Sequence, residues 1–150
     1  MLANIELVVL SFTASIGFGI VFQIHKKDLI FAGIGGAITR IFYIFFMSFI
    51  SHRLLYAAAS AFIAALYAEI IAKHRNSPST LFLYPAIIPL IPGDLFYYTM
   101  YGMVESNRNK FEYYMSESLL SLVGISIGFV LVSSVTLYLR RRKVATNRQN

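Results

Sequence analysis

The stretch Tyr84-Pro-Ala-Ile-Ile-Pro-Leu-Ile-Pro-Gly-Asp94 decides how this chain is interpreted, because it interrupts a long apolar segment. A proline inside a helix removes one backbone donor and pushes against the carbonyl four residues earlier, at a cost of about 3 kcal/mol. Because Pro85 and Pro89 are four residues apart, the carbonyl of Pro85 loses its usual donor. Pro92 and Gly93 add a second interruption, since glycine tolerates a positive φ. A helix through this stretch is therefore predicted to break between Pro85 and Gly93.

The composition around the stretch is that of a membrane protein. Of the 150 residues, 57% are hydrophobic and 13% are charged, whereas about a quarter of a soluble domain is charged. So few polar side chains cannot cover a water-exposed surface, and the mean hydropathy of +0.66 excludes disorder. The net charge of +6 lies in short clusters between apolar segments, which is typical of membrane loops and not of nucleic-acid binding. We expect a single integral membrane domain over residues 1–150.

The hydrophobic segments have the length of membrane spans. About 20 mainly apolar residues cross a bilayer as a helix, which satisfies its own backbone in lipid. Four segments meet this test directly, and a fifth is long enough but holds the proline stretch; the five are 5–24, 29–50, 54–72, 79–104 and 118–139. The predicted fold is all-α and polytopic, with about five transmembrane helices of which the fourth is broken at Pro85–Gly93. Residues 105–117 form either an interfacial helix or an extension of the fifth span.

The distribution of lysine and arginine predicts the orientation, because cytoplasmic loops carry an excess of both. With the N-terminus outside, nine of these residues lie on the inner side: Lys26, Lys27, Lys73, Arg75, Arg140, Arg141, Arg142, Lys143 and Arg148. The outer side carries three: Arg53, Arg108 and Lys110. We therefore expect the N-terminus outside and the C-terminus in the cytoplasm, with a basic tail at 140–150.

Ionisable side chains inside the spans indicate function, because each costs at least about 2.5 kcal/mol at the bilayer centre. Arg40 lies roughly 16 Å into the second span, near its mid-depth. Asp94 is predicted at a comparable depth, where it pairs with Arg40, caps the helix that follows the break, or does both. Glu69 lies near the inner face, where it either pairs with Lys73 four positions on or takes part in proton coupling.

The broken span itself resembles a binding element in its physical character. Carbonyls freed at mid-membrane must face protein or a wet cavity, and discontinuous helices build transporter sites in which half-helix N-termini attract anions. The predicted substrate- or ion-binding residues are Arg40, Pro85, Pro89, Pro92, Gly93, Asp94, Tyr97 and Tyr98. The alternative is a proline-kinked helix whose carbonyls are satisfied by neighbouring helices.

Enzyme motifs are not supported by their setting. Gly124-Ile-Ser-Ile-Gly128 matches the nucleophile pattern G-x-S-x-G, but it lies inside a membrane span, away from the three histidines. We interpret it as a helix-packing face, like the glycines at positions 33, 35 and 36. The chain has no cysteine, and the histidine spacing does not suggest metal ligands. We therefore expect neither an enzyme nor a bound metal or cofactor.

The broken span, read with the preceding Ala72-Lys-His-Arg-Asn-Ser-Pro78, resembles the threonine/serine exporter family, in particular its small five-span component. The segments His25-Lys-Lys-Asp28, Phe31-Ala-Gly-Ile-Gly-Gly36 and Ser60-Ala-Phe-Ile-Ala-Ala65 fit the same pattern, so the resemblance covers essentially the whole chain. It implies a multi-pass protein of the plasma or inner membrane that exports small amino acids or small organic acids. It also implies a larger partner subunit of the same family with a cytoplasmic region, and an ion or proton gradient as the driving force.

The residues and the resemblance together predict a transporter subunit that works by alternating access with this partner, with another copy of itself, or with both. In this hypothesis Arg40 meets a substrate carboxylate, and Asp94 or Glu69 responds to protonation. Two alternatives stay open: a non-transporting scaffold or regulatory subunit, and a homo-oligomeric channel.

Overall fold

The computed structural model describes the backbone of residues 2–147 and the surroundings of side chains from residue 4 to residue 138. Within this range the elements are all helical: α1 (Leu2–Val21), α2 (Leu29–Phe49), α3 (Arg53–Arg75), α4 (Thr80–Ile87), the 3-10 helix η1 (Ile88–Leu90), α5 (Gly93–Val104) and α6 (Arg108–Asn147). The all-α prediction is confirmed.

The predicted pattern of spans is also confirmed. Among the described residues α1, α2, α3 and α6 are each long and apolar enough to cross a membrane, and α4–η1 with α5 passes the same test as a pair bent by 49°. The first span ends earlier than predicted, because α1 stops at Val21 and Gln23 turns the chain with a φ of 57°. Residues 108–117 belong to α6, so the polar stretch extends the fifth span and is not a separate interfacial helix.

Small residues on α2 let its neighbours approach closely. A Cβ at Gly36 would collide with Ser15 Oγ of α1, and a Cβ at Gly33 would lie 2.8 Å from atoms of Phe12 and Ile16. On the opposite side, a Cβ at Gly35 would lie 2.8 Å from the ring of Tyr67 on α3. The helix is therefore packed on both faces, as predicted from its glycines.

The α3–α6 contact uses small residues in the same way. A Cβ at Gly124 or at Gly128 would collide with the carbonyl oxygen of Leu54 or of Ala58, respectively. The two helices run in the same direction, since later residues of α6 meet later residues of α3. The alanine-rich face of α3 is buried between α2, α4 and α6. This confirms the interpretation of the G-x-S-x-G match as a packing face.

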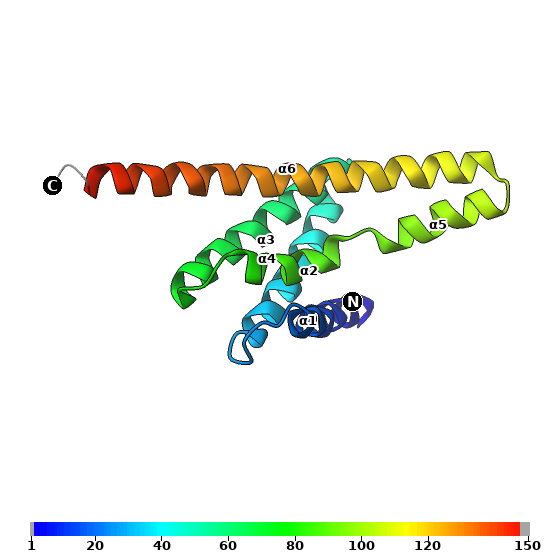
Figure 1. Ribbon diagram of the computed structural model, residues 1–150. Helices are drawn as coiled ribbons and strands as arrows, with labels where there is room; N and C mark the ends of the chain where they lie inside the picture. Colours follow the sequence, from blue (N-terminus) through cyan, green and yellow to red (C-terminus); the bar gives the residue numbers. More distant parts are fainter. Residues whose placement is uncertain (1, 148–150) are drawn as a thin grey trace.

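The hairpin of α5 and α6 projects beyond the other helices (Figure 1). Among the described residues, the extensive helix contacts of α5 are with α6. The ring of Tyr98 stacks on Tyr114 at a centroid distance of 5.1 Å, and the backbone of Phe111 fills the space above Gly102. We call the end with this hairpin and the loop 50–52 the hairpin end. The opposite end, with the loops 22–28 and 76–79, is the basic end.

Each end is fastened by an ion pair between helices. At the basic end Arg75 Nε lies 2.7 Å from Asp28 Oδ1, which connects the start of α2 to the end of α3. At the hairpin end Arg53 Nε lies 2.5 Å from Glu117 Oε2, which connects the start of α3 to α6. The chain thus crosses between the two ends in the alternating order that the span pattern predicts.

Candidate functional site

The break in the fourth span lies within the predicted interval, Pro85–Gly93, and occupies its later part. Pro85 lies inside α4, which continues to Ile87, and the 3-10 helix η1 follows. The chain becomes extended at Ile91, with φ −62° and ψ 121°, before α5 begins. The backbone at Pro85 remains helical, and the fixed φ of proline is compatible with this conformation. The break is therefore produced by Pro89 and Pro92, not by Pro85.

The carbonyl that the proline pattern frees is satisfied by a neighbouring helix. Ser15 Oγ of α1 donates a hydrogen bond to the Pro85 carbonyl at 2.8 Å, and both residues are fully buried. The expectation that this carbonyl faces a wet cavity is therefore wrong. The alternative, a carbonyl paired with a neighbour, holds for Pro85. This partner could not be predicted from the sequence, because Ser15 is one of several small residues along α1.

Arg40 lies beside the broken helix with few partners. Its Nη1 donates to the Pro89 carbonyl at 3.5 Å, the outer limit for a hydrogen bond, and its Cζ lies 5.4 Å from the centre of the Tyr43 ring. Its Nε is buried without a hydrogen-bond partner among the described residues. A guanidinium has five N–H donors, so most of the hydrogen-bonding capacity of Arg40 is unused.

Asp94 does not meet Arg40 in this structure. The four ion pairs among the described residues include neither residue. Asp94 is exposed and lies in the first turn of α5, where the N-cap position is taken by Pro92. The fourth span bends by 49° just before α5, and the extensive helix contacts of α5 among the described residues are with α6 and not with α2. The predicted pair and the predicted cap are therefore both absent, although a carboxylate in the first turn still favours the helix dipole.

The two tyrosines after the break lie in the second turn of α5, and much of each side chain is exposed. Tyr97 and Tyr98 are both exposed, and their rings meet edge to face at 5.4 Å. Tyr97 also stacks on Tyr101 one turn further on, at 6.3 Å. Asp94 and these aromatic side chains form a largely exposed surface, which we call the α5 face (Asp94, Tyr97, Tyr98 and Tyr101), and α6 covers it only in part, through the Tyr98–Tyr114 stack.

Glu69 lines a small cavity near the basic end. The cavity has a volume of about 110 Å³ and lies between α3, α4 and α6. Its polar lining consists of Glu69, Ser79, Thr80 and Ser133, while Ala65 and Ala68 provide the space. The three hydroxyl residues were not singled out from the sequence, because nothing in a serine or threonine of an apolar helix indicates which other helix it meets.

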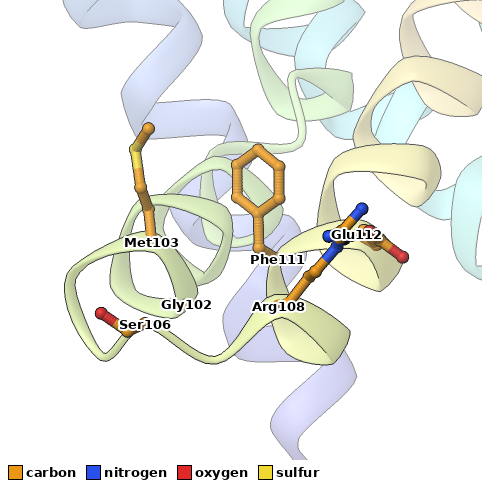
Figure 2. A pocket seen from close by; sticks show the side chains of 6 residues that line it. All are labelled: Gly102, Met103, Ser106, Arg108, Phe111 and Glu112. Atoms are coloured by element: carbon orange, nitrogen blue, oxygen red, sulfur yellow. Dashed lines mark hydrogen bonds and ion pairs between the residues drawn. The ribbon is translucent and has the colours of Figure 1, made fainter.

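A larger hollow lies at the turn of the α5–α6 hairpin, and its lining residues are more than 60 positions after Arg40 in the sequence. It encloses about 390 Å³ and is lined by Gly102, Met103, Ser106, Arg108, Phe111 and Glu112. Figure 2 shows Met103 and Phe111 projecting from the two helices toward the same side, with Arg108 beside Glu112. The Arg108–Glu112 pair, at 2.7 Å, is largely exposed. This hollow is open to the surroundings and holds none of the predicted site residues.

The turn next to this hollow is held by polar contacts. Lys110 Nζ donates to Glu105 Oε2 at 3.0 Å. Hydrogen bonds from Tyr101 and from Lys110 hold the pKa of Glu105 below its usual value. The carboxylate is therefore ionised at neutral pH, and it stabilises the turn rather than exchanging protons there.

Comparison with known proteins agrees with the resemblance. The family described as Threonine/Serine exporter, ThrE matches residues 7–135, which include every predicted site residue. No curated protein and no solved structure matches the chain. The matched range covers the four continuous candidate spans almost completely and the whole of the broken one. The chain belongs to the threonine/serine exporter family.

Proposed function

We propose that this chain is a subunit of a transporter in the plasma or inner membrane that exports threonine, serine or small organic acids. Membership of the exporter family supports transport, and the helices long enough to span a membrane support the location. The observation that carries the proposal is the unused hydrogen-bonding capacity of Arg40 beside the broken helix.

Arg40 is the proposed site for the substrate carboxylate. A carboxylate offers two oxygens to a guanidinium and forms paired, charge-assisted hydrogen bonds. The single 3.5 Å contact to the Pro89 carbonyl is weak, so little is lost when a carboxylate replaces it. The Pro89 carbonyl is the proposed partner of the substrate's ammonium group, because the amide of Gly93, which would donate to it in a continuous helix, donates to the Ile91 carbonyl instead.

Glu69 is the proposed ion- or proton-coupling residue. Its carboxylate borders an internal cavity together with three hydroxyl-bearing side chains, and such a group can exchange a proton or a small cation without facing lipid. The cavity lies near the basic end, which by its lysines and arginines is the cytoplasmic end. Export would then begin on the side where this cavity lies.

The α5 face is the proposed contact with a partner. A chain of this length offers little room for two units that rock against each other, as alternating access requires. A larger subunit of the same family with a cytoplasmic region, or a second copy of this chain, would cover the α5 face and bring a cation to Asp94. Asp94, Tyr97 and Tyr98 would then line the path at the junction of the two subunits.

Reconstitution tests this proposal. We expect Arg40→Ala and Asp94→Asn each to abolish the efflux of labelled serine, threonine or a dicarboxylate from proteoliposomes that also contain the larger subunit of the same family. Loss of a charge-assisted contact is worth about 1.5–3 kcal/mol, or more than tenfold in affinity. Arg108→Ala, which alters an exposed arginine at the hairpin end, is the control.

The same experiment separates other functions. If both variants assemble and export at the wild-type rate, neither residue belongs to the mechanism. Ion conductance by the purified chain alone would indicate a homo-oligomeric channel. Partner-driven efflux that continues without this chain would indicate a scaffold.

A further inference from the structure

A continuous row of contacting aromatic and charged side chains extends from Arg40 to the hairpin end. Beyond the Arg40–Tyr43 contact, the rings of Tyr43 and Tyr56 meet edge to face at a centroid distance of 5.3 Å. The Cζ of Arg53 lies 5.8 Å from the centre of the Tyr56 ring, and its Nε lies 2.5 Å from Glu117 Oε2. Three helices, α2, α3 and α6, supply these residues. Two guanidinium groups therefore follow each other along the molecule, separated by a pair of tyrosines.

The position of the second guanidinium fits the exit side of a path. α2 ends at Phe49, at the hairpin end, and Arg40 lies about 13 Å before this point along the helix axis at 1.5 Å per residue. Arg53 is the first residue of α3, directly after the loop at the hairpin end. Arg53 thus stands at the hairpin end, above Arg40. With the basic end in the cytoplasm, a substrate that leaves Arg40 outward meets Arg53 next.

The Arg53–Glu117 pair differs from an ordinary surface pair. Its side chains are 25% and 24% exposed, whereas those of Arg108 and Glu112 at the same end of the molecule are 87% and 59% exposed. Tyr56 beside it is buried. A charge in such surroundings is costly to leave without a partner. A carboxylate partner therefore stabilises Arg53, and a carboxylate other than that of Glu117 can serve in the same way.

We propose that Arg53 is a second carboxylate-binding site on the exit side, and that Glu117 is a resident counter-ion which the substrate carboxylate replaces. This inference rests on the proposed function of Arg40. The exchange puts one carboxylate in place of another, so Arg53 stays paired while the substrate passes. When the substrate leaves, Glu117 returns and again joins α6 to the start of α3. Glu117 thus competes with the substrate for Arg53 and sets how fast it is released.

Removing the competitor tests the exchange directly. Glu117→Gln in the assembled transporter is expected to tighten L-threonine binding about tenfold or more, the effect of one charge-assisted contact, and to slow efflux at saturating substrate. Threoninamide, which lacks the carboxylate, is expected to bind as it does to the wild type. Arg53→Gln is expected to weaken L-threonine binding from the hairpin side. Arg108→Gln and Glu112→Gln are the matched controls and are expected to change neither quantity.

A reversed pair separates an exchange site from a structural contact. In the double variant Arg53→Glu with Glu117→Arg an ion pair still joins α3 to α6, but the guanidinium is now on α6 and no longer lies over the Tyr56 ring. A purely structural role predicts wild-type binding and efflux in this variant, which would overturn the proposal, whereas an exchange site predicts that efflux stays low. This variant decides the question even if Glu117→Gln does not fold.

The result for Arg40 separates a failure of the proposed exit site from a failure of the proposed function. If Arg40→Ala abolishes efflux while Glu117→Gln and Arg53→Gln behave like the Arg108 and Glu112 controls, the exit site is refuted and the proposed function stands. If Arg40→Ala exports at the wild-type rate, the proposed function itself fails.

Discussion

The hydrogen bond from Ser15 to Pro85 provides a sharp test of how the broken span is held. Ser15 Oγ lies 2.8 Å from the Pro85 carbonyl, and both residues are fully buried. In an unbroken helix the amide of residue 89 would donate to this carbonyl, but Pro89 has no amide hydrogen. Ser15→Ala therefore removes the side-chain donor of a buried carbonyl whose usual helical donor is missing.

The expected magnitude follows from the cost of an unsatisfied acceptor. Burying one without a partner costs about 1–3 kcal/mol in soluble proteins, and hydrogen bonds between membrane helices contribute about 0.6–2 kcal/mol. We expect Ser15→Ala to lower the free energy of unfolding by about 1 to 2 kcal/mol, which is about 5- to 30-fold in the folding equilibrium.

The assay is equilibrium unfolding in mixed detergent micelles, followed by circular dichroism as the denaturing detergent is increased. Ser126→Ala is the control, because Ser126 Oγ also donates to a carbonyl at 2.8 Å, but at an exposed position. That carbonyl, of Leu122, keeps its donor within α6. The control is expected to change the free energy of unfolding by less than about 0.5 kcal/mol.

A second background isolates the bond itself. In Pro89→Ala the restored amide can donate to the Pro85 carbonyl, so Ser15→Ala should cost less there than in the wild type. An equal loss in the two backgrounds, or a loss in Ser126→Ala as large as in Ser15→Ala, would refute the assigned role of Ser15.

Two further predictions concern packing and charge. Gly128→Leu is expected to lower the free energy of unfolding by about 1–3 kcal/mol, since its side chain collides with the α3 backbone, whereas Gly17→Leu extends into open space; equal losses in the same micelle assay would contradict this. Because Tyr101 and Lys110 lower the pKa of Glu105, its carboxylate stabilises the hairpin turn above its usual pKa of 4.5, and this stabilisation is lost as the pH falls through the lowered value. A carboxyl titration by NMR with a midpoint at or above 4.5 would contradict this prediction.

The membrane class, the number of spans and the presence of a break could all be predicted from the amino-acid sequence. These properties depend on local quantities: the length of an apolar segment, the lack of a donor at each proline, and the small size of residues such as Gly36 and Gly124. The lipid bilayer makes these local quantities decisive, because every backbone N–H and C=O group in the hydrocarbon region must find a hydrogen-bond partner. Arg40 was identified in the same way, since a charge within an apolar span is visible without knowing its neighbours.

The contacts between side chains of different helices could be learned only from the folded structure. The bend between η1 and α5 leaves Asp94 exposed in the first turn of α5, while Arg40 lies beside the Pro89 carbonyl. The crossing of α1 brings Ser15 to Pro85, and the parallel packing of α3 with α6 brings Arg53 to Glu117. Contacts between helices depend on the bend angle of each helix and on its rotation about its own axis. Small changes in either quantity add up over many residues. Hydrophobicity along the chain does not specify them.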